Sequence, residues 1–254
     1  MEHRFYKMTI RIYIGLLAVL LSSCSHYYYM PNAHNVPLFK EKNEYRATVA
    51  LGGGKETNTT EVQAAYSVTD NVAVMANFMA AQGGKKTSSN WARGYYADAA
   101  LGYYKPLDDY MVFEVYGGFG LSSQHHQYGG YGSGGNVDLN FSKLFVQPSF
   151  GVSFEKLDVA LSTRIGQVYF FEMTSEGILN SSTEIYSLGE ITANRTSYLL
   201  EPALTVRGGW KYLKLQIQLG LAQNLNNPGL KFEKMNLNFG LHLSLPNLRK
   251  ANSQ

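Results

Sequence analysis

Seven charged side chains interrupt apolar runs of this sequence, with apolar or small residues on either side. They are Arg46, Asp98, Glu114, Arg164, Glu201, Arg207 and Lys214. If the runs form strands, alternation turns these charges to the face opposite the apolar one. Charges on an enclosed face must pair or stay hydrated. We therefore expect an internal ion-pair network; the alternatives are a polar permeation path and a catalytic carboxylate pair.

Two adjacent histidines, His125 and His126, lie in a glycine- and tyrosine-rich stretch. Adjacent histidines do not easily share one metal ion, and no cysteine or acidic cluster accompanies them. We therefore predict no metal site and no cofactor. The stretch is typical of a mobile external loop, in which His125, His126, Tyr128 and Tyr131 would contact a surface ligand.

No catalytic arrangement is recognisable in the sequence. There is no serine with glycine on both sides at the spacing of a nucleophile elbow. The segments expected at the outer rim offer His125, His126, Glu172, Glu176 and scattered serines. We predict that the protein is not an enzyme and has no catalytic residues.

Cys24 is the single cysteine, and it follows a segment of the export type. Residues 1–23 begin with basic residues and contain a short apolar run, Ile12–Leu21. This run is too short to span a bilayer as a helix, which needs roughly 20 residues. The tetrad Leu21–Cys24 resembles the lipobox of bacterial lipoproteins, in which the cysteine is lipidated and becomes the mature N-terminus. The alternative is an ordinary signal peptide that is cleaved nearby.

Period-two alternation from Tyr45 to Leu245 supplies the elements that would position the charged residues. Ten runs show it, at residues 45–51, 62–68, 72–78, 95–103, 111–121, 144–154, 159–171, 198–206, 213–221 and 235–245. A strand with one apolar face fits this period, and a helix does not. We therefore predict an all-β fold, an antiparallel transmembrane β-barrel of about ten strands, with eight as the alternative. No useful helix pattern follows residue 42, and Pro148 and Pro202 predict a bulge or kink.

The connections between these runs alternate in length. Residues 69–71, 106–109, 155–158 and 208–211 are short, whereas most of the others are longer. Short periplasmic turns and longer external loops are typical of transmembrane barrels, and the aromatic residues at the run ends fit two interfacial girdles. Ile217 and Leu241 should then face lipid, and Gln218 should face the lumen. Arg164 and Glu201 lie at similar heights on neighbouring runs, so we predict that they pair.

Two segments carry resemblances to known families. Asn238–Leu245 resembles the terminal strand by which outer-membrane barrels are recognised for assembly, with Leu245 where an aromatic residue is usual. Pro31–Lys42 looks like the N-terminal signature of a family of Gram-negative outer-membrane barrel lipoproteins of mostly unassigned function, with Asn43 in place of the usual glycine. These resemblances imply the barrel-assembly machinery and the lipoprotein-processing machinery as partners.

The sequence thus predicts four segments. They are a lipoprotein signal peptide (1–23), a lipidated periplasmic tether (24–42), an outer-membrane barrel (43–246) and a periplasmic tail (247–254). The residues after Cys24 lack the acidic pair that some lipoproteins use as a surface-export signal, so we place the anchor on the periplasmic side. The long loops would be extracellular.

Composition limits the function. Charged residues make up 16% of the chain, and the net charge of +3 lies largely in the signal segment, which leaves no basic face for nucleic acid. A mean hydropathy of −0.20 is compatible with a barrel that has a polar lumen. Ten strands leave too little room for a general-diffusion pore.

We therefore predict a non-enzymatic outer-membrane lipoprotein with a structural or surface-binding role. Its partners would include membrane lipid and lipopolysaccharide, and the sequence does not identify a surface ligand. The alternatives are a narrow channel for small solutes or ions and a rim-located enzyme acting on lipid A or peptides. A soluble lipoprotein barrel that binds a small apolar ligand is a further one.

Overall fold

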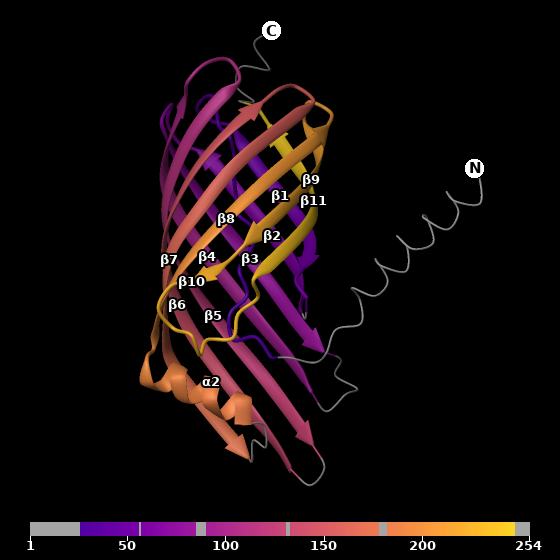
Figure 1. Cartoon of the computed structure of the whole chain (residues 1–254). Helices are drawn as coiled ribbons and strands as arrows, with labels where there is room; N and C mark the ends of the chain where they lie inside the picture. Colours follow the sequence, from indigo (N-terminus) through magenta and orange to yellow (C-terminus); the bar gives the residue numbers. More distant parts are fainter. Residues whose placement is uncertain (1–25, 56, 85–89, 131–132, 178–181, 247–254) are drawn as a thin grey trace, which may run out of the picture.

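The computed structural model describes residues 26–55, 57–84, 90–130, 133–177 and 182–246, which form one closed β-barrel (Figure 1). The predicted signal peptide, Cys24, Tyr131 and the tail 247–254 lie outside these residues. The strands are β1 (Tyr45–Gly53), β2 (Thr57–Ser67), β3 (Val72–Gly84), β4 (Trp91–Pro106), β5 (Met111–Gly130), β6 (Ser133–Ser153), β7 (Leu157–Gly177), β8 (Thr196–Gly209), β9 (Leu213–Leu221), β10 (Gln223–Asn224) and β11 (Met235–Leu245).

Antiparallel pairing closes the sheet on itself. Each strand from β1 to β8 pairs with the next, β8 pairs with β9, β9 with β11, and β11 returns to β1. The short β10 pairs with β8 in the register of β9 and so continues that strand. The barrel therefore has ten strands around its circumference, which confirms the predicted fold class and strand number.

The two faces of the wall follow the predicted alternation. Ile217 and Leu241 are 48% and 53% exposed on the outer face, whereas Gln218 is 1% exposed on the inner face. Aromatic side chains gather toward both ends of the outer face. Tyr103, Tyr110, Phe154, Trp210 and Tyr212 lie near the short turns, and Tyr95, Tyr169, Phe171 and Tyr198 lie toward the long loops. A continuous apolar exterior bounded in this way is that of a barrel surrounded by lipid.

The two prolines predicted to cause bulges leave the register unchanged. Pairing between β7 and β8 runs through Pro202, and pairing between β6 and β7 resumes in the same register beyond Pro148. Each proline lacks one hydrogen-bond donor, its backbone N–H, and therefore interrupts the ladder with only one of its two neighbouring strands. The register shift between β6 and β7 lies instead between Asn140 and Phe141.

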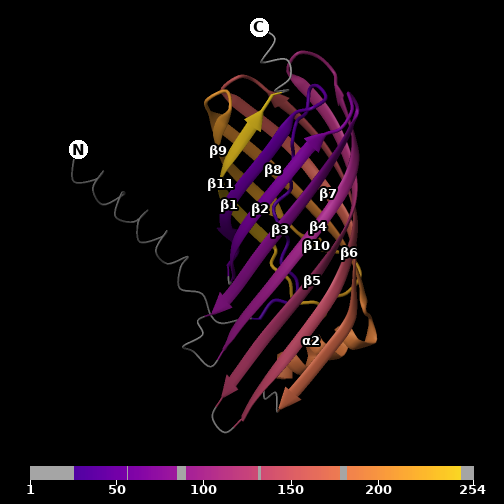
Figure 2. The same ribbon diagram turned by 180° about the vertical axis from the view of Figure 1, so that it is seen from behind.

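The barrel wall is much taller on one side than on the other. β5, β6 and β7 contain 20, 21 and 21 residues, whereas β1 and β9 contain nine each. Figure 2 shows β5–β7 extending past the other strands at the end where α2 lies. The stretch interpreted as a mobile loop around His125 is thus a β-hairpin that prolongs the wall.

A helix, α2 (Ser182–Ala193), follows the tall strand β7. The sequence prediction of no useful helix was wrong here, because the apolar face of α2 is short. Leu188 and Ile191 are buried, and Ile185 and Tyr186 are exposed. No helix within the described residues is long and apolar enough to cross a membrane.

Residues 26–40 lie inside the barrel, and we call this segment the plug (Figure 1, indigo). From His26 to Phe39 every residue is buried except Tyr27, which is half-buried. The packed interior clusters include Tyr28, Tyr29, Val36, Leu38 and Phe39 from this segment. Of the predicted periplasmic tether, residues 24–42, the barrel wall thus encloses residues 26–40.

Candidate functional site

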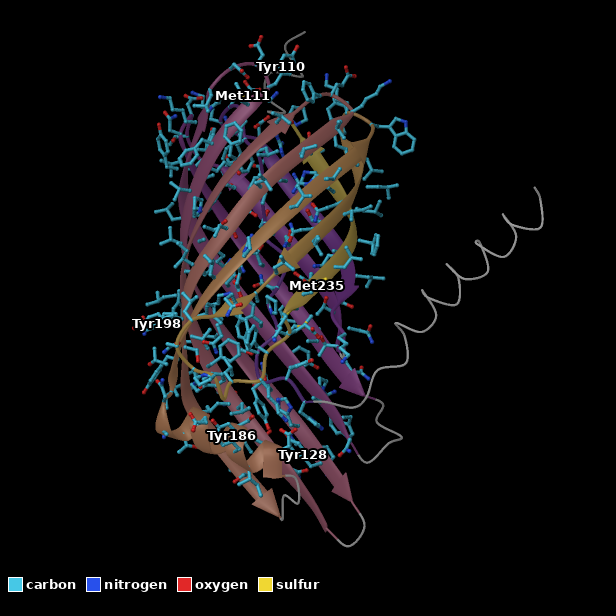
Figure 3. All side chains as sticks on the ribbon, in the orientation of Figure 1. Tyr110, Met111, Tyr128, Tyr186, Tyr198 and Met235 are labelled. Atoms are coloured by element: carbon cyan, nitrogen blue, oxygen red, sulfur yellow. The ribbon has the colours of Figure 1, made fainter. Side chains whose placement is uncertain are left out.

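The plug runs through the lumen from one end of the barrel to the other. At the long-loop end, Tyr28 N donates to Lys231 O at 2.9 Å, and Glu233 N donates to Tyr29 O at 3.0 Å. At the short-turn end, Lys40 Nζ donates to Asp109 O at 2.6 Å. In Figure 3, Tyr110 marks the short-turn end, and Tyr128 marks the opposite end.

Side chains of the wall hold the plug by its backbone. Ala33 N donates to Glu61 at 2.8 Å, His34 N to Gln218 at 2.6 Å, and Phe39 N to Glu114 at 3.1 Å. The plug carbonyls accept from wall side chains in the same way. These bonds run from Asn236 to Pro31 O, Gln63 to Ala33 O, Gln218 to His34 O, Gln147 to Asn35 O and Arg46 to Pro37 O. Buried backbone groups need such partners, because an unpaired one is costly.

Polar side chains of the plug contact the wall as well. Arg164 Nη1 donates to Asn32 Oδ1 at 2.6 Å, and Asn35 Nδ2 donates to Asn77 Oδ1 at 2.9 Å. The Nδ1 atom of His34 lies 2.7 Å from the hydroxyl of Ser162. These contacts fix the position of the plug along the barrel axis.

All seven charged residues predicted to face the lumen do so. Asp98, Glu114, Arg164, Glu201, Arg207 and Lys214 are at most 6% exposed, and the side chain of Arg46 is 10% exposed. Around the short-turn half, Lys214 pairs with Asp158 at 2.6 Å, and Arg46 pairs with Glu44 at 3.1 Å. The set of lumen charges predicted from the sequence omits Asp158, which was assigned to a short turn, and Glu44, which directly precedes the run at 45–51.

Arg164 and Glu201 lie directly opposite each other, as the count from the turns predicted. The predicted ion pair between them, however, is not the contact that forms. Glu201 pairs with Lys143 at 2.7 Å and accepts a hydrogen bond from the hydroxyl of Tyr29. Arg164 donates instead to Asn32 and Gln147. The plug separates the expected partners, since its side chains bond to both of them.

Lys143 is a further lumen charge, and it was not among the seven predicted from the sequence. It is fully buried, and its ammonium also donates to the Tyr29 hydroxyl at 2.5 Å. The residue precedes the run at 144–154 and lies on its polar phase, so alternation alone could have placed it in the lumen. Glu61 stands in the same relation to the run at 62–68, and it too is fully buried.

The long-loop end is closed by a polar and aromatic cap. Tyr28 donates to Glu184 of α2 at 2.5 Å, and its hydroxyl lies 2.7 Å from that of Tyr128. Lys231 forms an ion pair with the same Glu184. Apolar side chains of α2 pack in the cluster that contains Tyr28 and Tyr29. The cap thus joins α2 to the plug.

His125 and His126 point to opposite faces of β5 and so do not form one site. His126 is buried with its Nδ1 atom 3.2 Å from Nδ1 of His26, and burial lowers the pKa of His26. His125 is on the outer face, where its Nδ1 atom lies 2.7 Å from Asp138. Within the described residues, no cluster of three or more metal-ligating side chains occurs.

Comparison with known proteins places the chain by its fold. No protein family profile and no curated protein sequence matches it. The translocator domain of the autotransporter NalP from Neisseria meningitidis is similar in structure, with a TM-score of 0.50 and 10% identity over 95% of this chain and 96% of that one. The outer-membrane protease OmpT from Escherichia coli has a TM-score of 0.45 and 10% identity, over 82% and 98%. The KdgM porin has a TM-score of 0.36 and 10% identity, over 79% and 99%.

This chain therefore has the fold of outer-membrane β-barrel proteins. The prediction that the protein is not an enzyme is corrected by this finding. A protease is among the similar barrels, so the fold excludes no enzymatic activity, and it establishes none.

Proposed function

We propose that this protein is an outer-membrane barrel lipoprotein that is closed by its own plug and acts through its long-loop end, in a structural or surface-binding role. The plug contacts carry this proposal, because a peptide bonded to the wall along the lumen leaves no continuous path for solutes. The tall wall of β5–β7 and the cap formed by α2 then provide the surface that projects from the membrane.

Two features of the long-loop end support a binding role there. Ile185 and Tyr186 of α2 are more than half exposed, beyond the aromatic girdle. The hairpin of β5 and β6 adds His125, while Tyr128 lies in the cap. Membrane lipid and lipopolysaccharide would surround the barrel, and the barrel-assembly and lipoprotein-processing machineries would act on the chain before it reaches this state.

Conductance in planar bilayers separates this proposal from a narrow channel. The purified wild-type protein should show no steady ion conductance, because the plug occupies the lumen. Deletion of residues 26–39 should produce conducting events, provided that the variant still shows the heat-modifiable mobility of a folded barrel. Steady conductance by the wild-type protein would contradict the proposal and favour the channel.

Epitope tags test the proposed orientation. A tag at residues 131–132, between β5 and β6, should bind antibody on intact cells. A matched tag in the short turn at residues 155–156 should bind only after permeabilisation. The reverse result would mean that the long-loop end faces the periplasm.

A rim activity on lipid A or peptides is the enzymatic alternative. The His125–Asp138 pair on the outer face is the feature that such an activity would use, since a carboxylate orients an imidazole as a general base. Lipid A mass spectra from cells with and without the protein, together with peptide cleavage assays, would detect it. A product that disappears in His125→Ala would replace the binding role with catalysis.

A further inference from the structure

We propose that the acyl chains attached at Cys24 enter the outer leaflet of the outer membrane, so that the protein is anchored from the cell surface. This placement differs from the periplasmic anchor predicted from the residues after Cys24. It rests on the proposed function in two respects, namely lipidation at Cys24 and the external position of the long loops. The observation that supports this placement is the path of the plug through the barrel, which begins at the long-loop end.

The first described residue of the plug lies at the long-loop end. The ring of His26 is 4.1 Å from the ring of Tyr128, and its Nδ1 atom is 3.2 Å from that of His126. Tyr128 lies five residues beyond Ser123, which pairs with the girdle residue Tyr95. At about 3.3 Å per residue and a tilt near 40°, Tyr128 stands about 13 Å above the girdle. His26 is therefore on the long-loop side of the apolar band.

The short distance in sequence between Cys24 and His26 fixes the side of the anchor. Two residues reach at most about 7 Å, because an extended chain spans about 3.3–3.6 Å per residue. The apolar band of a barrel of this type is about 25 Å tall. A lipid on Cys24 cannot reach the opposite leaflet while His26 stays in place.

The plug cannot supply the missing length by sliding. Moving it one residue toward the short turns would break three bonds together, namely those from His34 N to Gln218, from Ala33 N to Glu61 and from Arg164 to Asn32. Lys40, at the other end, is held by backbone carbonyls of Asp109 and Ser153. The anchor is therefore committed to one side of the membrane.

The first residues of the plug lie beside the long-loop ends of three wall strands. Tyr27 and Met30 line a small pocket with Thr57, Arg93 and His126, at the long-loop ends of β2, β4 and β5. The girdle residue Tyr95 is two positions from Arg93 on β4, at the boundary with lipid. Tyr27 therefore shares a pocket with an exposed residue two positions from the girdle on β4, which suits an anchor in the adjacent leaflet.

Site-specific proteolysis on intact cells tests the placement. A recognition sequence for one protease is inserted between Ser25 and His26, and in separate variants at residues 131–132 and 155–156. We expect the first two sites to be cut on intact cells and the third only after permeabilisation. Cutting at the N-terminal site should also separate the barrel from radiolabelled fatty acid. A Ser25→Cys variant, labelled with a membrane-impermeant maleimide, gives an independent measurement.

The outcomes distinguish the inference from the proposed function. If residues 131–132 are cut on intact cells but the N-terminal site and Ser25→Cys react only after permeabilisation, or never, the surface anchor is refuted and the barrel orientation stands. If residues 155–156 are cut on intact cells and 131–132 are not, the orientation itself is wrong. If the released fragment carries no fatty acid and the mature N-terminus is unmodified, the lipoprotein assignment fails.

Discussion

The outer and inner faces of this barrel wall are built from the same strands but are covered by different materials. Lipid covers the outer face, and it requires only apolar side chains of any shape. A peptide covers the inner face, and it requires donors and acceptors at fixed positions along the lumen. The loss of stability caused by a substitution on the outer face should therefore depend on its depth in the membrane and on the polarity of the new side chain. On the inner face, the loss should depend on which partner the original side chain bonds.

The largest loss of stability is expected for Glu201→Ala on the inner face. It leaves the Lys143 ammonium buried without its carboxylate, and breaking a buried pair in this way costs about 3–5 kcal/mol. The free energy of unfolding, measured by denaturant titration in detergent or vesicles, checks this. A double-mutant cycle should show stronger coupling of Glu201 with Lys143 than with Arg164. Equal coupling to both would mean that the plug does not separate Arg164 from Glu201.

Ile217→Arg should produce the next largest loss. An arginine on the lipid face near the membrane midplane costs about 2–4 kcal/mol, and near the interface about 0–1 kcal/mol. Leu225→Arg is the matched control, because Leu225 is 58% exposed and follows β10 at the long-loop end. Equal losses at the two positions would contradict the position of the lipid boundary.

Gln218→Ala and Gln216→Ala separate plug binding from general stability. Both glutamines are buried on the inner face of β9, but Gln218 bonds the backbone of His34 and Gln216 bonds Arg207. Each change should cost about 1–3 kcal/mol, because buried partners lose a hydrogen bond. Only Gln218→Ala should raise the ion conductance. Conductance raised equally by Gln216→Ala would show that the plug is not held by these contacts.

Tyr186→Ala should have the smallest effect, within about 0.5 kcal/mol in unfolding free energy, because the side chain is 58% exposed on α2. Leu188→Ala is its control on the buried face of the same helix and should lower stability measurably. If Tyr186→Ala lowered stability more than Leu188→Ala, the face of α2 that carries Tyr186 would be the buried one, which would contradict the structure.

The fold was predictable because the outer face leaves a simple mark on the sequence. In runs such as Met235–Leu245, every second side chain is apolar because it faces lipid. Each strand and its lumen-facing charges can therefore be recognised from that strand's own sequence. The opposition of Arg164 and Glu201 was predictable for the same reason, from distances to the turns.

The plug was not predictable in this way. Residues 26–39 have no periodic pattern, because their environment is set by side chains from strands that are far apart in sequence. Glu61 on β2 and Gln218 on β9 meet at adjacent plug residues, Ala33 and His34. The predicted pairing of Glu201 with Arg164 was wrong for the same reason, because the plug could not be foreseen. Its residues Tyr29 and Asn32 bond the two charges that were expected to pair.

The pairing of β1 with β11 has a consequence for how the barrel assembles. This pairing joins the first strand to the last, Tyr45 to Leu245, so the sheet can close only after the whole chain has been made. The plug precedes β1 and also bonds β9 and β11, through Gln218 and Asn236. Its binding site is thus completed by the last strands to form. The sheet must curl around a segment that is already present. Once it has closed, an N-terminal end acylated as we propose could not pass through it without reopening the β1–β11 seam.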